Sequence, residues 1–204
     1  MMSNRNRRMS SLATPIYLFV EGEKSETVYF EILRKQLEIS SLKILHKGGK
    51  SGNALLNAAK NEMNLNSSLD PKAIKYLVFD KDAMTKEQLD DILIKATEEG
   101  FEIAFSNLNF EVWLLSHFEK LTKRPTSPTD KIWLEKELTK KLNQSYKKGD
   151  RRQLEKIVSN YEIAIKNASA VCKVDFDYQC TTIGVMIKEI VNERTKSRKQ
   201  KGGI

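Results

Sequence analysis

The sequence predicts an α/β protein whose mainly parallel, four-stranded sheet is flanked by helices. Two segments, PIYLFV (15–20) and IKYLVFD (74–80), are continuous apolar runs rich in β-forming residues, which is typical of strands buried on both faces of a parallel sheet. Segments with apolar residues at helical spacing alternate with these runs. The alternation favours right-handed crossovers that place helices on both faces of the sheet.

The other elements of this region follow from periodicity and from residues that start or end helices. Ser25 and Thr85 are the expected N-caps of the first and third helices, and Gly100 is expected to end the third. The other two strands are expected at 41–46 and 101–106, and the three helices at 24–38, 53–65 and 86–100.

Beyond residue 107 the strand signal fades and helical patterns dominate. Helices are expected at 109–121 and within 131–144, 151–171 and 181–193, with a proline-containing loop at 122–130. The chain is therefore expected to consist of a disordered basic arm (1–14), an α/β core (15–120), a helical extension packed on that core (121–194) and a disordered basic tail (195–204).

Length, charge and apolar content limit the class of protein. The 204 residues allow one domain of ordinary size plus a helical extension. The net charge of +8 favours a polyanionic partner such as nucleic acid. No apolar run reaches the roughly 18 residues of a membrane span, and the first residues lack the apolar centre of a signal peptide, so we expect a cytoplasmic protein without membrane contact. Cys172 and Cys180 match no redox or zinc motif and are expected to be free thiols.

Acidic residues follow two of the predicted strands directly. Glu21 follows the first strand, and Asp80 and Asp82 follow the third in the sequence VFDKDAM. Ligands of open parallel sheets bind at the carboxyl ends of the strands, so these carboxylates are expected to form one all-oxygen pocket there. Mg²⁺ or Mn²⁺ prefers such ligands, and one or two such ions can support phosphodiester cleavage.

Three segments together carry a resemblance to a known family. FVEGEKSETVYFEIL, YLVFDKDAM and FSNLNFEVWLLSHFE, spread over about residues 15–120, resemble the RloB-like proteins, and weaker similarity covers most of the remaining chain. These are bacterial proteins with a Toprim domain, related to the OLD-family nucleases. Their genes lie beside restriction or abortive-infection genes, often with an ATPase partner. The resemblance implies a Toprim-like fold for the core.

The resemblance also implies roles for individual acids. Glu21 matches the Toprim glutamate, a metal ligand or general base, and Asp80 and Asp82 match the Mg²⁺-coordinating aspartates. Glu26 matches the second acid of the OLD-type motif and is a conditional second-metal ligand. From its position at the start of the helix after the fourth strand, Glu111 is expected to be either a further metal ligand or a clamp on a basic residue.

Two basic stretches are candidate phosphate contacts. KGGKSG (47–52) lacks the first glycine of a P-loop, but Lys47 and Lys50 follow the second strand at the same edge of the sheet. The second stretch, YKKGDRR (146–152), is a solvated face or a track for nucleic-acid phosphates. Its candidate contacts are Lys147, Lys148, Arg151 and Arg152.

Other conspicuous residues are expected to have ordinary roles. Trp113 and His117 fall on one helix face and are expected to be packed in the core, and His46 is a weak candidate for proton transfer. Glu23 is expected to be a solvated loop charge. Gly22 either forms a tight turn or leaves room for a metal or phosphate.

Two functions remain open. The first is a Mg²⁺-dependent Toprim nuclease that cuts DNA or RNA, for example tRNA, in anti-phage defence. The second is a catalytically silent nucleic-acid-binding or regulatory subunit of an ATPase-containing defence complex. A phosphatase or receiver domain is disfavoured, because D-x-D follows the third strand rather than the first, and Met84 stands where such phosphatases have a hydroxyl or valine residue.

Overall fold

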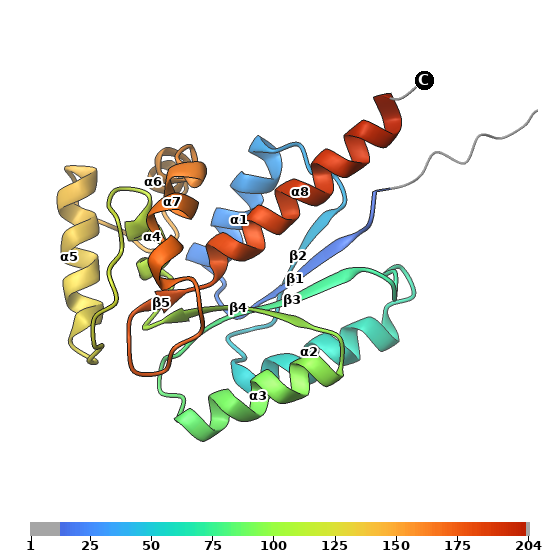
Figure 1. Cartoon of the computed structure of the whole chain (residues 1–204), viewed down its shortest axis with the longest axis horizontal. Coiled ribbons are helices and arrows are strands. Elements are labelled where there is room, and N and C mark those ends of the chain that lie inside the picture. Colours follow the sequence, from blue (N-terminus) through green and yellow to red (C-terminus); the bar gives the residue numbers. More distant parts are fainter. Residues whose placement is uncertain (1–12, 203–204) are drawn as a thin grey trace, which may run out of the picture.

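The computed structural model describes the backbone of residues 13–202 and the side chains of residues 13–196. Its centre is one five-stranded sheet with the order β2-β1-β3-β4-β5 (Figure 1). The strands are β1 (Ile16–Val20), β2 (Leu42–His46), β3 (Ile74–Asp80), β4 (Glu102–Asn107) and β5 (Cys180–Thr181). The first four are parallel to one another, and β5 pairs antiparallel with β4.

Helices cover both faces of the sheet, which confirms the predicted α/β class. In Figure 1, α2 and α3 lie below the sheet, α1 and α8 lie above it, and α4 to α7 gather at the end where the parallel strands finish. The helices are α1 (Ser25–Gln36), α2 (Gly52–Leu65), α3 (Lys86–Glu98), α4 (Glu111–Ser116), α5 (Asp130–Leu142), α6 (Arg151–Val158), α7 (Tyr161–Asn167), the 3-10 helix η1 (Ser169–Val171) and α8 (Ile183–Gly202).

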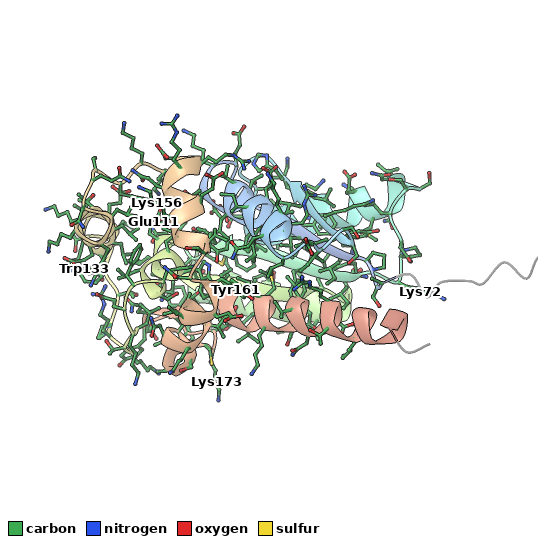
Figure 2. The ribbon with its side chains drawn as sticks, turned by 90° about the horizontal axis from the view of Figure 1, so that it is seen from above. Lys72, Glu111, Trp133, Lys156, Tyr161 and Lys173 are labelled. Carbon is green, nitrogen blue, oxygen red and sulfur yellow. The ribbon has the colours of Figure 1, made fainter. Side chains whose placement is uncertain are left out.

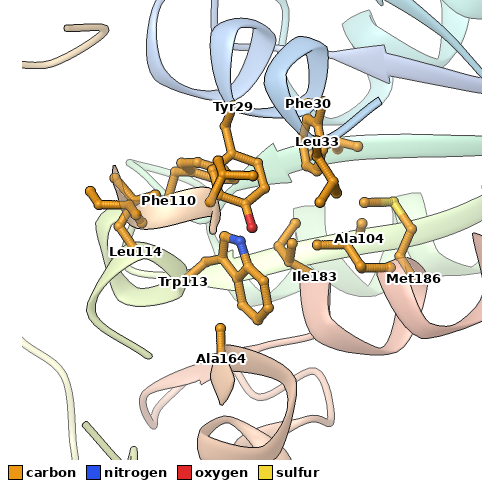
Figure 3. Close-up of a cluster of buried hydrophobic side chains, with 14 of the residues drawn as sticks. Tyr29, Phe30, Leu33, Ala104, Phe110, Trp113, Leu114, Ala164, Ile183 and Met186 are labelled. Atoms are coloured by element: carbon orange, nitrogen blue, oxygen red, sulfur yellow. The ribbon is translucent and has the colours of Figure 1, made fainter. Parts of the chain in front are cut away.

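The alternation of β1 side chains divides the core between the two faces of the sheet. Tyr17 and Phe19 pack with the α2–α3 side, whereas Ile16, Leu18 and Val20 pack with the other side. Figure 3 shows the second side, where Tyr29 of α1, Trp113 of α4 and residues of α8 meet. Trp113 is fully buried, which confirms its predicted place in the core.

The sheet has one strand more than predicted. A helix was expected to begin at Thr181, but Cys180 and Thr181 pair with the end of β4. The Thr181 and Ser106 hydroxyl oxygens lie 3.1 Å apart, and Thr182 Oγ1 accepts a hydrogen bond from the Phe105 N–H at 2.9 Å. The extension therefore completes the sheet and contributes to its core through α8.

Several predicted boundaries also shift. Lys24, not Ser25, is the N-cap of α1, and no side chain caps it, whereas Thr85 caps α3 through a reciprocal capping box with Gln88. The α8 backbone remains helical to Gly202, past residue 194, where a disordered tail was expected. The predicted arm lies outside the described residues except for residues 13 and 14.

None of the helices in the described part of the chain has the length and apolar character that a membrane span requires.

Candidate active site

Acidic side chains from neighbouring strands meet in one cavity at the carboxyl edge of the sheet. Glu21 follows β1 and Asp80 ends β3, and these two strands are adjacent, so the two residues lie next to each other. A cavity of about 520 Å³ is lined by Glu21, Glu26, Asp80 and Asp82, together with Gly22, Glu23, His46, Gly48, Gly49, Asn109, Lys131 and Lys148. The structure thus brings together four of the five predicted acids.

Glu21 and Asp80 are held by backbone groups of the neighbouring elements. The Asp80 N–H donates a hydrogen bond to Glu21 Oε2 at 3.4 Å, and the Phe110 N–H donates one to Asp80 Oδ2 at 3.0 Å. Burial, reinforced by the nearby Asp82 charge, raises the pKa of Glu21 to about 7. Burial and the Glu26 and Glu111 charges raise the pKa of Asp80 well above its ordinary value. The site is therefore short of positive charge.

Glu26 reaches the cavity from the first turn of α1. Its carboxylate lies directly over Gly22, because a Cβ added to Gly22 would stand 1.9 Å from Glu26 Oε2. Burial is the main cause that raises the pKa of Glu26 to about 7, and the charges of Glu111 and Glu21 add to it. Gly22 is thus the residue that leaves room for this carboxylate.

Glu111 contacts a basic residue, which was one of its two expected roles. Its side chain is only 2% exposed and lies 3.3 Å from Lys148 Nζ. The Tyr146 hydroxyl donates a hydrogen bond to Glu111 Oε1 at 3.0 Å. Glu111 does not line the main cavity, but it lines an adjoining pocket together with Glu26 and Asp80.

Asp82 lies at the rim of the cavity, where its side chain is half exposed. Its Oδ1 lies 2.5 Å from Lys131 Nζ, at the start of α5. Lys131 and Lys148 both line the cavity, and both belong to the helical extension. The extension therefore supplies cations to a site whose acids come from the sheet region.

Asn109 is a site residue that the sequence reasoning missed. It is 3% exposed and lines the cavity, yet neither its Oδ1 nor its Nδ2 has a hydrogen-bond partner among the described residues. Buried amides are normally hydrogen-bonded, so this one is placed to contact a ligand. The sequence feature that could have identified it is its position between the fourth strand and the following helix, at the same edge of the sheet as the acids.

The donor set of this cavity fits a hard divalent cation. All the acidic groups that could bind it offer oxygen atoms, and burial together with neighbouring negative charge raises the pKa values of Glu21 and Glu26. The Asn109 amide, which has no partner among the described residues, is available for a further ligand contact. Within the described residues, however, no three His, Cys, Asp or Glu side chains are already positioned as a metal-binding group. The carboxylates share a cavity without forming a ready-made ligand cage.

The predicted basic contacts have different surroundings. Lys47 forms an ion pair with Glu62 at 2.9 Å, and its ammonium lies 5.6 Å from the centre of the Phe19 ring, so it is turned toward the α2 side. Arg151 pairs with Glu31 at 2.9 Å and lines a separate groove beside α1. Of the six predicted contacts, only Lys148 lines the cavity; Lys50, Lys147 and Arg152 are exposed.

His117, Glu23 and the two cysteines have the ordinary surroundings that were expected of them. His117 is buried, and its Nε2 lies 3.0 Å from the Tyr29 hydroxyl. Burial lowers the pKa of His117 to about 4, so the ring is neutral at pH 7. Glu23 is exposed, and Cys172 and Cys180 are free. His46 lines the cavity, but its buried Nε2 has no partner among the described residues.

Comparison with known protein families adds an independent observation to this geometry. A model of the RloB-like protein family matches residues 16–190, which include the whole sheet and every residue of the cavity. The chain belongs to the RloB-like family. No curated protein and no solved structure matches it. The region that matches the family model thus contains both the acids of the sheet region and the two cavity lysines of the extension.

Proposed function

We propose that this RloB-like protein is a Mg²⁺- or Mn²⁺-dependent nuclease that hydrolyses phosphodiester bonds in DNA or RNA, and that it acts in bacterial anti-phage defence, with an ATPase partner. The observation that carries the proposal is the convergence of Glu21, Glu26 and Asp80 on one cavity at the carboxyl edge of the sheet. The resemblance of the strand-end motifs to Toprim nucleases supports the same reaction.

The residues of the cavity suit the parts of such a reaction. A bound divalent cation would supply charge stabilisation and an activated water. Glu21 and Asp80, with Glu26 beside them, would hold it. Where Asp80 and Glu26 alone hold the cation, Glu21, whose pKa is about 7 in the metal-free site, is suited instead to accept a proton from the attacking water near neutral pH. Lys131 and Lys148 place positive charge where the phosphates of a nucleic acid would enter.

The test is metal-dependent cleavage of labelled DNA, tRNA and other RNA by the protein alone and together with the product of any neighbouring ATPase gene. We expect cleavage with Mg²⁺ or Mn²⁺, none with EDTA, and loss of cleavage in the Asp80→Ala/Asp82→Ala double variant. Asp90→Ala is the control, since Asp90 is an exposed acid of α3 that does not line the cavity. A double variant that cleaves like the parent would disprove the proposed site.

A second candidate function is the catalytically silent nucleic-acid-binding or regulatory subunit. Two contacts favour it: Lys131 lies against Asp82, and Lys148 against Glu111, so lysines neutralise part of the acidic charge without a metal. Calorimetry with Mg²⁺ and Mn²⁺ separates the two functions. Absence of binding at millimolar concentrations of either ion would favour the silent subunit.

A further inference from the structure

A second cavity adjoins the acids on the side of the sheet that α2 and α3 cover. It has a volume of about 420 Å³, and Glu21 and Asp82 line both this cavity and the main one. Its other walls include Ser51, Asn53 and Ala54 around the start of α2, and Ala83, Met84 and Gln88 around the start of α3. We call it the α2–α3 pocket. Because the two acids line both cavities, they lie on the border between them.

The topology explains why this pocket lies at the acidic edge of the sheet. α2 follows β2 and α3 follows β3, so both helices begin near the carboxyl ends of parallel strands. Figure 2 shows Glu111 toward that end of the molecule, whereas Lys72, which precedes β3, lies at the opposite end. The Asn53 side-chain amide donates a hydrogen bond to Asp91 Oδ2 at 2.7 Å, which ties α2 to α3. A ligand would therefore meet a preformed pocket, which lowers the entropy cost of binding.

One part of the pocket lining is apolar. The partly buried Met84 side chain packs against the core on the α2–α3 side. Its methyl carbon would stand 3.1 Å from a Cβ added to Gly52, so Gly52 lets Met84 lie close to the backbone of α2. Ala54 and Ala83 are exposed and small, and their side chains leave the pocket open. A flexible thioether beside small residues is suited to lie against the flat face of an aromatic ring.

The pocket also offers a hydrogen-bond acceptor without a partner. Asn53 Oδ1 is buried and has no hydrogen-bond partner among the described residues, although the amide nitrogen of the same side chain is bonded to Asp91. Buried polar atoms are normally hydrogen-bonded, so a donor on a ligand would satisfy this oxygen. Nucleobases combine apolar faces with N–H groups along their edges, which matches the apolar lining and the free acceptor.

The two cavities differ in their cations. The main cavity has Lys131 and Lys148, which suit phosphates. Among the described residues that line the α2–α3 pocket, the only cation is Lys81, and its ammonium donates a hydrogen bond to the Phe176 carbonyl at 2.7 Å and lies 3.9 Å from the centre of the Phe176 ring. The pocket therefore suits an uncharged part of the substrate, and its volume is within the roughly 300–1,000 Å³ of sites for small organic groups.

We propose that the α2–α3 pocket is a nucleoside subsite, which takes the sugar and base on one side of the scissile phosphate, while the chain on the other side passes Lys131 and Lys148 in the main cavity. A phosphodiester has a nucleoside on each side of its phosphorus, and a phosphate bound at Glu21 and Asp82 would place one of them at this pocket. The inference rests on the proposed function and extends it to a second binding site.

The first experiment uses uncharged nucleosides, so that neither the acids nor a missing metal decides the result. The protein is labelled with ¹³C in its methionine methyl groups, and adenosine, uridine or ribose is added at millimolar concentration in EDTA. At least one nucleoside should shift the Met84 methyl signal, which Met84→Leu identifies, and ribose should not. Met186 is the internal control, because it is buried on the other side of the sheet, and its signal should not move.

The second experiment fills the pocket. Ala54→Trp places a large side chain at an exposed position that lines the pocket, and Asn57→Trp places the same side chain about one turn further along α2, at an exposed position outside it. Ala54→Trp should abolish the shift of Met84 and lower kcat/KM for cleavage by about 5- to 100-fold, the range of one base contact. Its Mg²⁺ affinity should be parental, because every acid is retained. Asn57→Trp should behave like the parent in all three measurements.

Three results would overturn the inference: no shift of Met84 with either nucleoside, an equal shift with ribose, or a parental kcat/KM in Ala54→Trp. Failure of the proposed function looks different. In that case no metal supports cleavage by the parent, while the nucleoside-induced shift of Met84 and its loss in Ala54→Trp persist.

Discussion

The carboxylate of Glu26 occupies the space that a side chain at Gly22 would need, with Oε2 only 1.9 Å from an added Cβ. Gly22→Ala should therefore push this carboxylate out of the cavity. If Glu26 is a metal ligand, Mg²⁺ affinity and cleavage should both fall by about 10- to 100-fold, as when a supporting residue of a metal site is lost. Calorimetry and the cleavage assay measure these effects.

Asp90→Ala serves as the control for Gly22→Ala, because Asp90 is exposed on α3 and does not line the cavity. Parental Mg²⁺ affinity in Gly22→Ala would remove Glu26 from the ligand set.

The folding stability of the metal-free protein should decrease as the pH rises from about 5 to about 8. Glu21 and Glu26 have pKa values raised to about 7 by burial, so between pH 4.5 and 7 they bind more protons in the folded than in the unfolded state. Folding stability is therefore highest at the acidic side of this window and decreases as the pH rises through it. We expect Tm in EDTA to be about 2–8 °C higher near pH 5 than near pH 8, a range that allows for solvent screening of these partly exposed groups.

Scanning calorimetry checks this dependence. Glu21→Gln/Glu26→Gln should remove most of it, because amides do not titrate. Added Mg²⁺ should raise Tm of the parent at pH 8 and much less at pH 5, where protons compete for the carboxylates. An unchanged Tm across this window in the parent would show that burial does not raise the pKa values of the two carboxylates.

Loss of Lys148 should destabilise the fold as well as weaken ligand binding. Lys148→Met leaves Glu111, which is 2% exposed, with the Tyr146 hydroxyl and without its cation. The free energy of unfolding in urea should fall by about 1–3 kcal/mol, the cost of leaving a buried charged group short of a partner. In Glu111→Gln/Lys148→Met most of this loss should be recovered.

The adjacent Lys147 provides the comparison for Lys148, because its side chain is exposed. Lys147→Met should keep parental stability, and a similar loss in both variants would assign the effect to general charge rather than to Glu111.

The unpartnered Asn109 amide should lower the stability of the fold, and the reaction should nevertheless need it. Its buried amide has no partner among the described residues, so Asn109→Leu, which replaces it by an apolar group of similar size, should raise the free energy of unfolding by about 1–2 kcal/mol. The same change should lower cleavage by at least about tenfold, since a ligand contact is lost. Urea unfolding and the cleavage assay give the two values. A more stable variant with full activity would show that Asn109 does not touch the substrate or the metal.

The sequence was sufficient to place the acids because local rules decide their positions. Glu21 and Asp80 each end a strong apolar run, and parallel strands bring such ends to one edge. The residues that contact them from the extension follow no such rule. Lys131 meets Asp82 across 49 positions of the chain, and no periodic pattern signals a contact of that kind.

The elements that were missed are those with the weakest local signal. A strand of two residues, Cys180–Thr181, is too short to show alternation, and it is specified instead by hydrogen bonds between Thr181, Thr182 and β4. The start of α1 was misplaced by one residue because Ser25 packs against the Tyr146 hydroxyl, at 3.5 Å, instead of capping the helix.

The late position of β5 has a consequence for how the protein is synthesised. The outer edge of β4 is completed only by Cys180 and Thr181, more than 70 residues after β4 itself ends at Asn107. During translation, that edge and the apolar face later covered by α8 remain open until the ribosome has made β5 and α8. A nascent or prematurely terminated chain would therefore carry an unpaired strand edge, the kind of surface through which unfinished proteins pair with one another.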